Sequence, residues 1–281
     1  RAKNINILIC AVERDGEVYI PSGHFKLHAG DVLSFVGSRP MSRAFLDFIG
    51  FKTNRVSDAM IVGGGDVAYY LANQLINMGI DVKIIEKEKD RCERLSILLP
   101  KAVIINADGT DQDVLKEEGL SNAESFVALT GIDEENILLT LHARHVSGAK
   151  TITKINRSNF KEVISNLNLG SVFYPSFITA ETITAYVRAK SNTRSMNSSV
   201  QTLYHMFDFR VEAIEFRVDE ASEVTSKPLM DLKLKKDVLI AFINRNGTII
   251  TPSGHDAIEV GDTAMVVTTH TGFNDIRDIL A

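Results

Sequence analysis

A cluster of glycines gives this sequence a segment suited to holding a phosphate. Residues 63–68 read Gly-Gly-Gly-Asp-Val-Ala, which is a Gly-x-Gly-x-x-Ala pattern between an apolar run and a helical pattern. In this context Gly63 allows a tight turn, Gly65 lets the backbone approach a pyrophosphate, and Ala68 allows close packing of helix on strand. The following helix begins with free N–H groups and a positive dipole end, which favour an anion. The predicted ligand contacts in this segment are Gly63, Gly64, Gly65, Asp66 and Val67.

An acidic residue about 20 positions further on completes the pattern. Glu86 ends the next apolar run. A carboxylate there accepts hydrogen bonds from ribose hydroxyls and repels a 2′-phosphate, so the sequence favours NAD or an adenine nucleotide over NADP. Asp66 lies in the first helical turn, where its carboxylate can cap the free N–H groups and compete with a phosphate. We therefore expect modest affinity.

Later turns supply further candidate contacts. They are Asp108, Gly109 and Thr110 after the third predicted strand, Thr130 and Gly131 after the fourth, and Lys154 at the end of the fifth. Ligands of open parallel sheets bind at the carboxyl ends of the strands, where these turns meet. We predict adenosine contacts from the first turn, backbone contacts from the second, and phosphate neutralisation by Lys154. A helix cap and a solvated lysine are the structural alternatives.

The segment that carries these candidates, residues 57–190, alternates short β-rich runs with helical stretches. This alternation is typical of a parallel sheet with helices on both faces. The expected strands are 59–62, 82–86, 102–105, 125–129, 151–155 and 172–174. Thr110 is the expected cap of the third helix, and further helices are expected at 134–146 and 177–189. The fold class is therefore α/β, with a Rossmann-like doubly wound parallel sheet.

An internal repeat flanks this segment. Pro21-Ser22-Gly23-His24 recurs as Pro252-Ser253-Gly254-His255, and the same offset relates Arg14 to Arg245 and Asp31 to Asp262. Shared turn residues predict the same small α+β lobe at both ends of the chain. The sheet is thus flanked by a partial lobe at 1–50 and a complete lobe at 210–281, with a connector at 191–209.

Within the second lobe, strands are expected at 212–218, 238–243, 248–251 and 263–268. A short helical stretch is expected at 228–234, a tight turn at Asn246-Gly247, and a terminal helix from about Gly272. By the repeat offset, Arg1 corresponds to Leu232, so the first copy lacks the opening strand and helix of the second. We therefore expect this sequence to be a piece of a longer protein.

Composition narrows the classes of function. The 281 residues are 44% hydrophobic and 24% charged, with a net charge of −5. This balance is that of a globular protein and argues against nucleic-acid binding. No apolar run approaches the roughly 18 residues needed to span a bilayer, so no direct membrane insertion is expected. The two cysteines have no metal-site spacing and fit a reducing cytosol. Hydrolase and Walker A motifs are absent from the sequence, so we expect neither a catalytic residue nor a metal site.

The order of these parts resembles the RCK (regulator of potassium conductance) family, in which Rossmann lobes alternate with small C-terminal lobes. The resemblance rests on residues 61–72, 108–111 and 128–136, and it extends over nearly the whole chain. The two repeat copies resemble the RCK C-terminal lobes. Carried over to this sequence, the ligand contacts are Gly63–Val67, Glu86, Thr130, Gly131 and Lys154, with the 108–110 turn as a weaker addition. Lysine at position 154, where arginine is usual, departs from the family pattern.

The resemblance implies a regulatory role rather than an enzymatic one. It implies a cytoplasmic subunit, at the inner face of the plasma membrane, that binds NAD(H) or ATP/ADP and forms a homo-oligomeric ring. Its implied partner is a TrkH-type integral membrane potassium transporter subunit, gated through ligand-dependent conformational change. The alternatives are an NAD-dependent oxidoreductase on the same nucleotide fold, and a ligand sensor without a membrane partner.

Overall fold

The computed structural model describes residues 7–51, 54–157, 159–191, 200–207 and 210–281. The chain divides into two compact units, one of Arg1–Thr53 with Ala180–Ala281 and the other of Asn54–Thr179. Each unit is described by itself. Helix α7, Pro175–Ser191, contains the division, whereas the sequence placed the end of the central lobe at residue 190.

The unit of residues 54–179 is built on a six-stranded parallel sheet. Its strands are β4 (Asp58–Val62), β5 (Asp81–Glu86), β6 (Val103–Asn106), β7 (Ser125–Ala128), β8 (Lys150–Lys154) and β9 (Ser171–Phe173). They lie in the order β6-β5-β4-β7-β8-β9, and every neighbouring pair is parallel. The order reverses between β4 and β7, and such a reversal opens a crevice at the carboxyl ends of the strands. The predicted doubly wound Rossmann-like sheet is confirmed.

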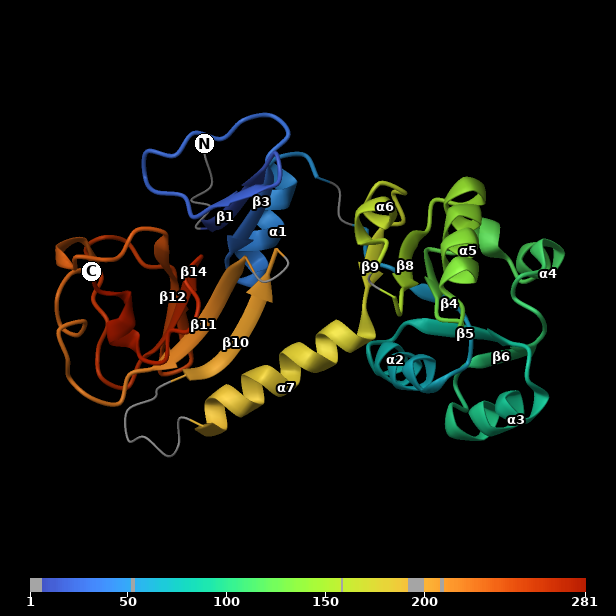
Figure 1. The fold of residues 1–281 in the computed structure, drawn as a ribbon. Helices are drawn as coiled ribbons and strands as arrows, with labels where there is room; N and C mark the ends of the chain where they lie inside the picture. Colours follow the sequence, from blue (N-terminus) through green and yellow to red (C-terminus); the bar gives the residue numbers. More distant parts are fainter. Residues whose placement is uncertain (1–6, 52–53, 158, 192–199, 208–209) are drawn as a thin grey trace. The chain divides into compact units, whose positions relative to one another are not determined.

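Helices cover both faces of this sheet (Figure 1). They are α2 (Asp66–Asn77), α3 (Lys89–Leu98), α4 (Gln112–Glu117), α5 (Asp133–Val146) and α6 (Lys161–Ser165), with a 3₁₀ turn η1 (Leu120–Asn122). On one face, Ile61 packs with the small residues Ala68 and Ala72 of α2. On the other, Phe126 packs with Leu139 of α5. Strands apolar on both faces are expected where helices lie on both sides.

The start of α4 differs from the prediction. Its N-cap is Asp111, whose carboxylate accepts the backbone N–H of Asp113 at 2.9 Å. Thr110, the predicted cap, donates its hydroxyl to Asp108 at 2.7 Å. The Asp108 carboxylate, two residues before Thr110, is a stronger hydrogen-bond acceptor than the groups at the helix end. Its bond to the Thr110 hydroxyl therefore competes with capping of the helix by Thr110.

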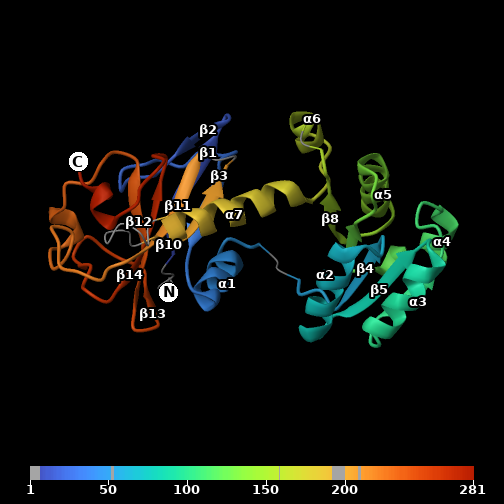
Figure 2. The same cartoon turned by 60° about the horizontal axis from the view of Figure 1, so that its bottom comes forward.

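The second lobe contains a five-stranded antiparallel sheet in the order β10-β11-β14-β12-β13 (Figure 2). Its strands are β10 (Val200–Met206), β11 (Val211–Arg217), β12 (Val238–Arg245), β13 (Thr248–Ile250) and β14 (Thr263–Thr268). Its described residues also form the 3₁₀ turns η3 (Leu229–Asp231) and η4 (Ile276–Ile279), the second in place of the expected terminal helix.

The expected connector at 191–209 was wrong in part, because it contains β10. This strand pairs with β11 in antiparallel register and buries Leu203 beside Ile214 in the lobe core. Its apolar residues, at positions 200, 203, 204 and 206, do not alternate, so the period-2 signal of a strand is missing from the sequence. The remaining connector positions, 192–199 and 208–209, lie outside the described residues.

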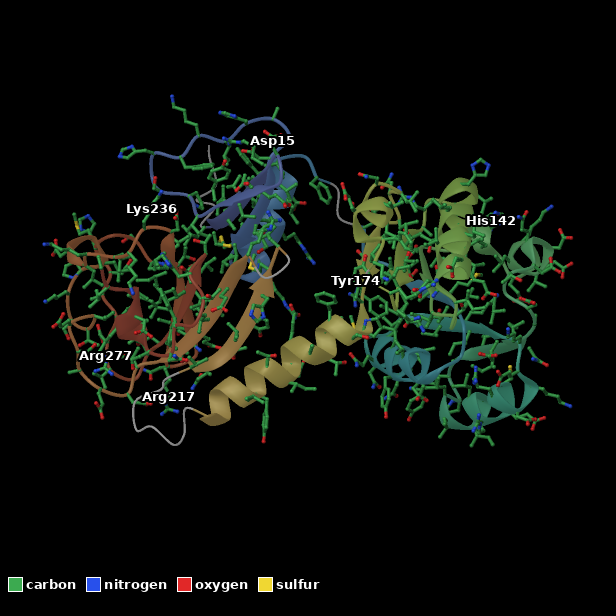
Figure 3. All side chains as sticks on the ribbon, in the orientation of Figure 1. Asp15, His142, Tyr174, Arg217, Lys236 and Arg277 are labelled. Atoms are coloured by element: carbon green, nitrogen blue, oxygen red, sulfur yellow. The ribbon has the colours of Figure 1, made fainter. Side chains whose placement is uncertain are left out.

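The first repeat copy forms β1 (Leu8–Arg14), β2 (Glu17–Tyr19), β3 (Val32–Val36) and α1 (Arg39–Phe48). Its order β2-β1-β3 matches β13-β12-β14, and both copies have a bulge at the equivalent place. The turn residues match as well: Asp15, labelled in Figure 3, has a φ of 50° and its equivalent Asn246 a φ of 52°. The repeat predicted from the sequence is therefore a repeat of structure.

One arginine–aspartate pair fixes the same loop in each copy. Arg14 binds Asp31 through two hydrogen bonds of 2.7 Å, and Arg245 binds Asp262 at 2.9 and 2.8 Å. Asp262 also accepts the backbone N–H of Glu259 at 2.8 Å and is buried. Burial raises the pKa of Asp262, but the Arg245 guanidinium and this N–H outweigh it, so that the pKa lies below its ordinary value.

We expect Asp262→Asn to destabilise the second lobe by about 2 kcal/mol at neutral pH, because the amide loses the charge-assisted bonds to Arg245. A carboxyl with a lowered native pKa contributes stability above its unfolded pKa, near 4, and loses it as pH falls through the native value. The variant should therefore match the wild type in acid. Hydrogen exchange of β14 measures the effect. The control is Asp219→Asn, which breaks an exposed pair with Arg217 and should cost little; equal losses in both variants would contradict the assignment.

Candidate functional site

A cleft of about 800 Å³ lies in the unit of residues 54–179, at the reversal of strand order. It is within the size range of small-molecule and cofactor sites. Of the predicted contact residues, it is lined by Gly63, Gly64, Gly65, Asp66, Glu86, Asp108, Gly109, Thr110, Thr130, Gly131 and Lys154. Val67 is the exception, and its side chain is partly exposed on α2. The structure thus brings nearly all candidates to one place.

Gly63 holds the glycine loop against β7. Its φ of 99° lies in the left-handed region, and a Cβ there would stand 2.8 Å from the carbonyl carbon of Leu129. Its own N–H donates to the carbonyl of Ile85 at 2.9 Å. Only glycine adopts this positive φ readily and has no Cβ to collide with Leu129. The role of Gly63 is therefore to shape the crevice.

Gly65 serves a different purpose from Gly63. It is the N-cap of α2, with an ordinary φ of −72°, and a Cβ at this position would meet no atom within 4 Å. The first intrahelical bond at this end runs from the N–H of Tyr69 to the carbonyl of Gly65. The N–H groups before Tyr69 therefore lack an intrahelical acceptor. Open space beside free N–H groups is the arrangement that a phosphate needs.

The expected cap by Asp66 is not formed. Among the described residues, no hydrogen bond reaches the Asp66 carboxylate, although Asp66 lines the cleft and begins α2. The N–H groups in the first turn of α2 are therefore not occupied by the Asp66 carboxylate. Its negative charge near them still opposes an anion, so the expectation of modest affinity stands as a prediction.

Glu86 is almost fully enclosed, with 4% of its surface exposed. One carboxylate oxygen accepts the backbone N–H of Gly64 at 2.7 Å and a guanidinium N–H of Arg91 at 3.2 Å, and the other accepts the N–H of Glu88 at 2.8 Å. Burial raises the pKa of Glu86, but these donors lower it by more than burial raises it. The pKa of Glu86 therefore lies below its ordinary value. Glu86 is thus an ionised group whose hydrogen-bonding capacity is largely spent inside the protein.

Cationic residues on α3 and just before it line the same side of the cleft and were not predicted. They are Lys87, Arg91 and Arg94. Arg91 is held by Glu86 and by Glu88, the second at 3.0 Å. Arg91 and Arg94 stand three positions apart, which places them on one face of a helix. That spacing after Glu86 is the signal that could have found them.

The turn of residues 108–110 is held by bonds within itself. The Asp108 carboxylate accepts the backbone N–H of Thr110 at 2.9 Å as well as its hydroxyl, and these bonds lower the pKa of Asp108. Gly109 approaches β4 so closely that a Cβ would collide with Val62. The turn lines the cleft through its backbone shape, and its Asp108 serves as a local brace.

Asn136 joins the two loops on the β7–β8 side of the cleft. Its side-chain oxygen accepts the N–H of Thr130 at 2.8 Å, and its amide donates to the carbonyls of Thr130 at 3.2 Å and Lys154 at 3.0 Å. Asn136 is completely buried. The N–H of Thr130 is thereby occupied, which leaves Gly131 as the backbone group of this loop with open space beside it. Asn136 was not among the predicted contact residues, although it ends the 128–136 segment that carries the family resemblance.

Lys154 lies half-buried at the same side, where its ammonium donates to the carbonyl of Leu129 at 3.2 Å. Burial lowers its pKa, and the negative charge of Asp133 opposes that shift. The buried Asp133 in turn binds the N–H groups of Asn156 and Arg157 at 2.8 and 2.9 Å. An ammonium has three N–H donors, so Lys154 keeps donors for an anion in the cleft.

The described part of the chain lacks two features that would indicate other classes of function. No group of three or more His, Cys, Asp or Glu side chains is arranged there to hold a metal ion. None of the helices in these residues has the length and apolar character to cross a membrane.

The sequence matches the TrkA-N domain family over residues 59–175 and the TrkA-C domain family over residues 1–50 and 213–281. It is 29% identical over 273 residues to Trk system potassium uptake protein TrkA homolog 1 of Methanosarcina mazei, covering 96% of this chain and 59% of the relative. It is also 29% identical over 224 residues to the TrkA homolog of Pyrococcus horikoshii, covering 79% of this chain and 96% of the relative.

Solved structures show the same fold. The RCK domain of GsuK matches 93% of this chain and 54% of that chain, at 16% identity and a TM-score of 0.51. A structure of the GsuK channel bound to NAD matches 93% of this chain and 45% of that one, at 17% identity and a TM-score of 0.52.

The two domain matches define the class of protein, a chain built from TrkA-N and TrkA-C domains. The chain belongs to the family built from TrkA-N and TrkA-C domains. The curated relatives that it matches are named Trk system potassium uptake proteins. It spans 59% of the length of TrkA homologs 1 and 2 of Methanosarcina mazei.

Proposed function

We propose that this chain is a nucleotide-binding regulatory part of a potassium uptake system, with NAD(H) or ATP/ADP in the cleft of residues 54–179. The observation that carries the proposal is the open space at Gly65, next to the free N–H groups of α2 and at the reversal of strand order. The names of the relatives and the NAD-bound GsuK structure support the biological setting and the ligand.

Regulation follows from the two sides of the cleft. A nucleotide whose phosphates lie on the Gly63–Val67 loop also reaches the side formed by Gly131 and Lys154. It therefore binds one separation of these sides better than another, and it can shift the conformation only by that difference in affinity. The assembly we propose is a cytoplasmic homo-oligomeric ring at the inner face of the membrane, acting on a TrkH-type transporter subunit.

The test is calorimetric titration of the purified protein with NAD⁺, NADH, ATP and ADP. We expect saturable binding of at least one of them, with a Kd in the micromolar range typical of modest sites (about −8 kcal/mol at 1 μM). Absence of binding by all four at millimolar concentration would refute the proposal. Sustained oxidation of NADH with added metabolites would instead favour an oxidoreductase.

A second measurement tests the regulatory part of the proposal. Hydrogen exchange of the protein, alone and with the bound nucleotide, should show changed protection both at residues 63–67 and at 129–131. A ligand that alters protection only at its phosphate loop would be bound without closing the cleft, and the regulatory part of the proposal would then fail.

A further inference from the structure

The ribose end of the cleft carries a charge arrangement that the acidic residue alone does not predict. In the Rossmann pattern, the carboxylate at the end of the second strand marks the place of the adenosine ribose and discriminates against a 2′-phosphate. Here that carboxylate, Glu86, is 4% exposed and receives three donors from the protein, of which one is the Arg91 guanidinium. A carboxylate paired in this way repels a nearby anion much less than a free one.

The cations around Glu86 remain on the cleft wall. Arg91 is one-third exposed and joins Glu86 to Glu88. Arg94 lies on the same face of α3 and Lys87 directly follows β5, and both side chains are exposed. Among the described residues, neither of these two side chains forms an ion pair or hydrogen bond, although the charge of Lys87 lowers the pKa of the nearby Asp108.

The acidic groups at this end are already engaged. Glu88 pairs with Arg91 at 3.0 Å, and Asp108 is held by Thr110 through two bonds. Of the charged side chains that line the cleft from β5 to α3 and on the 108–110 turn, the two without a hydrogen bond or ion pair to a described residue are thus the cations Lys87 and Arg94. An arginine near the ribose is the feature by which this fold accommodates a 2′-phosphate, because guanidinium groups bind phosphate through paired hydrogen bonds.

We propose that Arg94 and Lys87, which line the same cleft as the paired Glu86, form a site for a phosphate on the adenosine ribose, so that the cleft takes 2′-phosphorylated dinucleotides at least as well as NAD(H). This proposal rests on the proposed function, since it assumes a nucleotide in the cleft. It reverses the preference that the sequence pattern alone indicates for Glu86.

The test compares two ligands that differ by a single phosphate. NAD⁺ and NADP⁺ are titrated into the wild type and into Arg94→Ala and Lys87→Ala. We expect NADP⁺ to bind the wild type with a Kd equal to or below that of NAD⁺. Arg94→Ala should weaken NADP⁺ about tenfold, the loss of one charge-assisted contact, and change NAD⁺ less than twofold. Lys87→Ala should weaken NADP⁺ by a smaller factor, because an ammonium lacks the paired geometry.

The control is Lys89→Ala, which removes a cation from the same helix. Lys89 is outside the cleft lining, 78% of its side chain is exposed, and its pair with Glu93 is 3.9 Å long. Its removal should leave the ratio of the two Kd values unchanged. NADP⁺ binding ten times weaker than NAD⁺ to the wild type, or an equal effect of Arg94→Ala on both ligands, would overturn this inference and leave the proposed function intact. Failure of every nucleotide to bind would overturn both.

Discussion

Gly65→Ala is expected to leave the fold intact and to abolish most nucleotide binding. The added methyl group meets no protein atom within 4 Å, and the φ of −72° is one that alanine adopts freely. Its effect on stability should stay within about 1 kcal/mol, as for other strain-free glycine replacements. The methyl group does, however, occupy the space through which a phosphate reaches the first turn of α2. Loss of two N–H contacts of about 1.5 kcal/mol each corresponds to roughly 100-fold weaker binding.

Gly148→Ala is the matched control for this variant. Gly148 also has open space at the Cβ position, is exposed, and lies outside the cleft lining. Titration with the preferred nucleotide and thermal unfolding are measured for both variants. Both should unfold near the wild-type temperature, and only Gly65→Ala should lose affinity. Unchanged affinity in Gly65→Ala would show that the phosphate does not lie at the α2 terminus.

Much of the Rossmann-like sheet could be predicted because its physical causes are local. β4 and β7 are buried on both faces, so they read as continuous apolar runs. The glycine loop could be predicted from its residue pattern before α2, although the close approach of Gly63 to Leu129 that requires this glycine is a tertiary contact. The repeat was visible since equal turns need equal residues, and Asp15 and Asn246 share a left-handed conformation.

The partners of the polar side chains could not be predicted in the same way. Glu86 was placed correctly at the end of β5, but its bonds to Gly64 and Arg91 depend on how α3 packs over the glycine loop. The N–H of Thr130 was expected to be available to a ligand, yet Asn136 from the following helix occupies it. Such bonds join residues whose neighbourhood is set by the tertiary fold, and no periodicity in the sequence encodes it.

The β10 strand was missed for a different reason. Val200–Met206 carries polar residues at several positions, because one face of this strand is not buried in the lobe core. The described residues of the first copy contain no counterpart of β10, so the repeat offered no second example of it. Backbone hydrogen bonds to β11 hold this segment as a strand, and its residue composition did not indicate that pairing.

Asn136→Ala is expected to destabilise the unit of residues 54–179 by about 3–4 kcal/mol and to weaken nucleotide binding. The substitution removes three hydrogen bonds and leaves the N–H and C=O groups of Thr130 and the carbonyl of Lys154 without that partner. Each buried polar group left unsatisfied costs about 1–3 kcal/mol, although some regain water in the cleft. Chemical unfolding measures the stability, and titration of the residual folded protein measures the affinity.

Asn136→Asp separates the role of these bonds from that of side-chain volume. An aspartate keeps the acceptor for the N–H of Thr130 but turns its second oxygen toward the carbonyls of Thr130 and Lys154. Burial and the two carbonyl oxygens disfavour the ionised form, so its native pKa is raised above the unfolded value. Such a group has its full stability below the unfolded pKa and loses it as pH rises through the native pKa. The variant should therefore approach the wild type near pH 4 and fall below it at pH 7, since the protonated carboxyl can donate one of the lost bonds. A stability deficit equal at both pH values would mean that Asn136 fills space and does not hold the β7 and β8 loops together by hydrogen bonding.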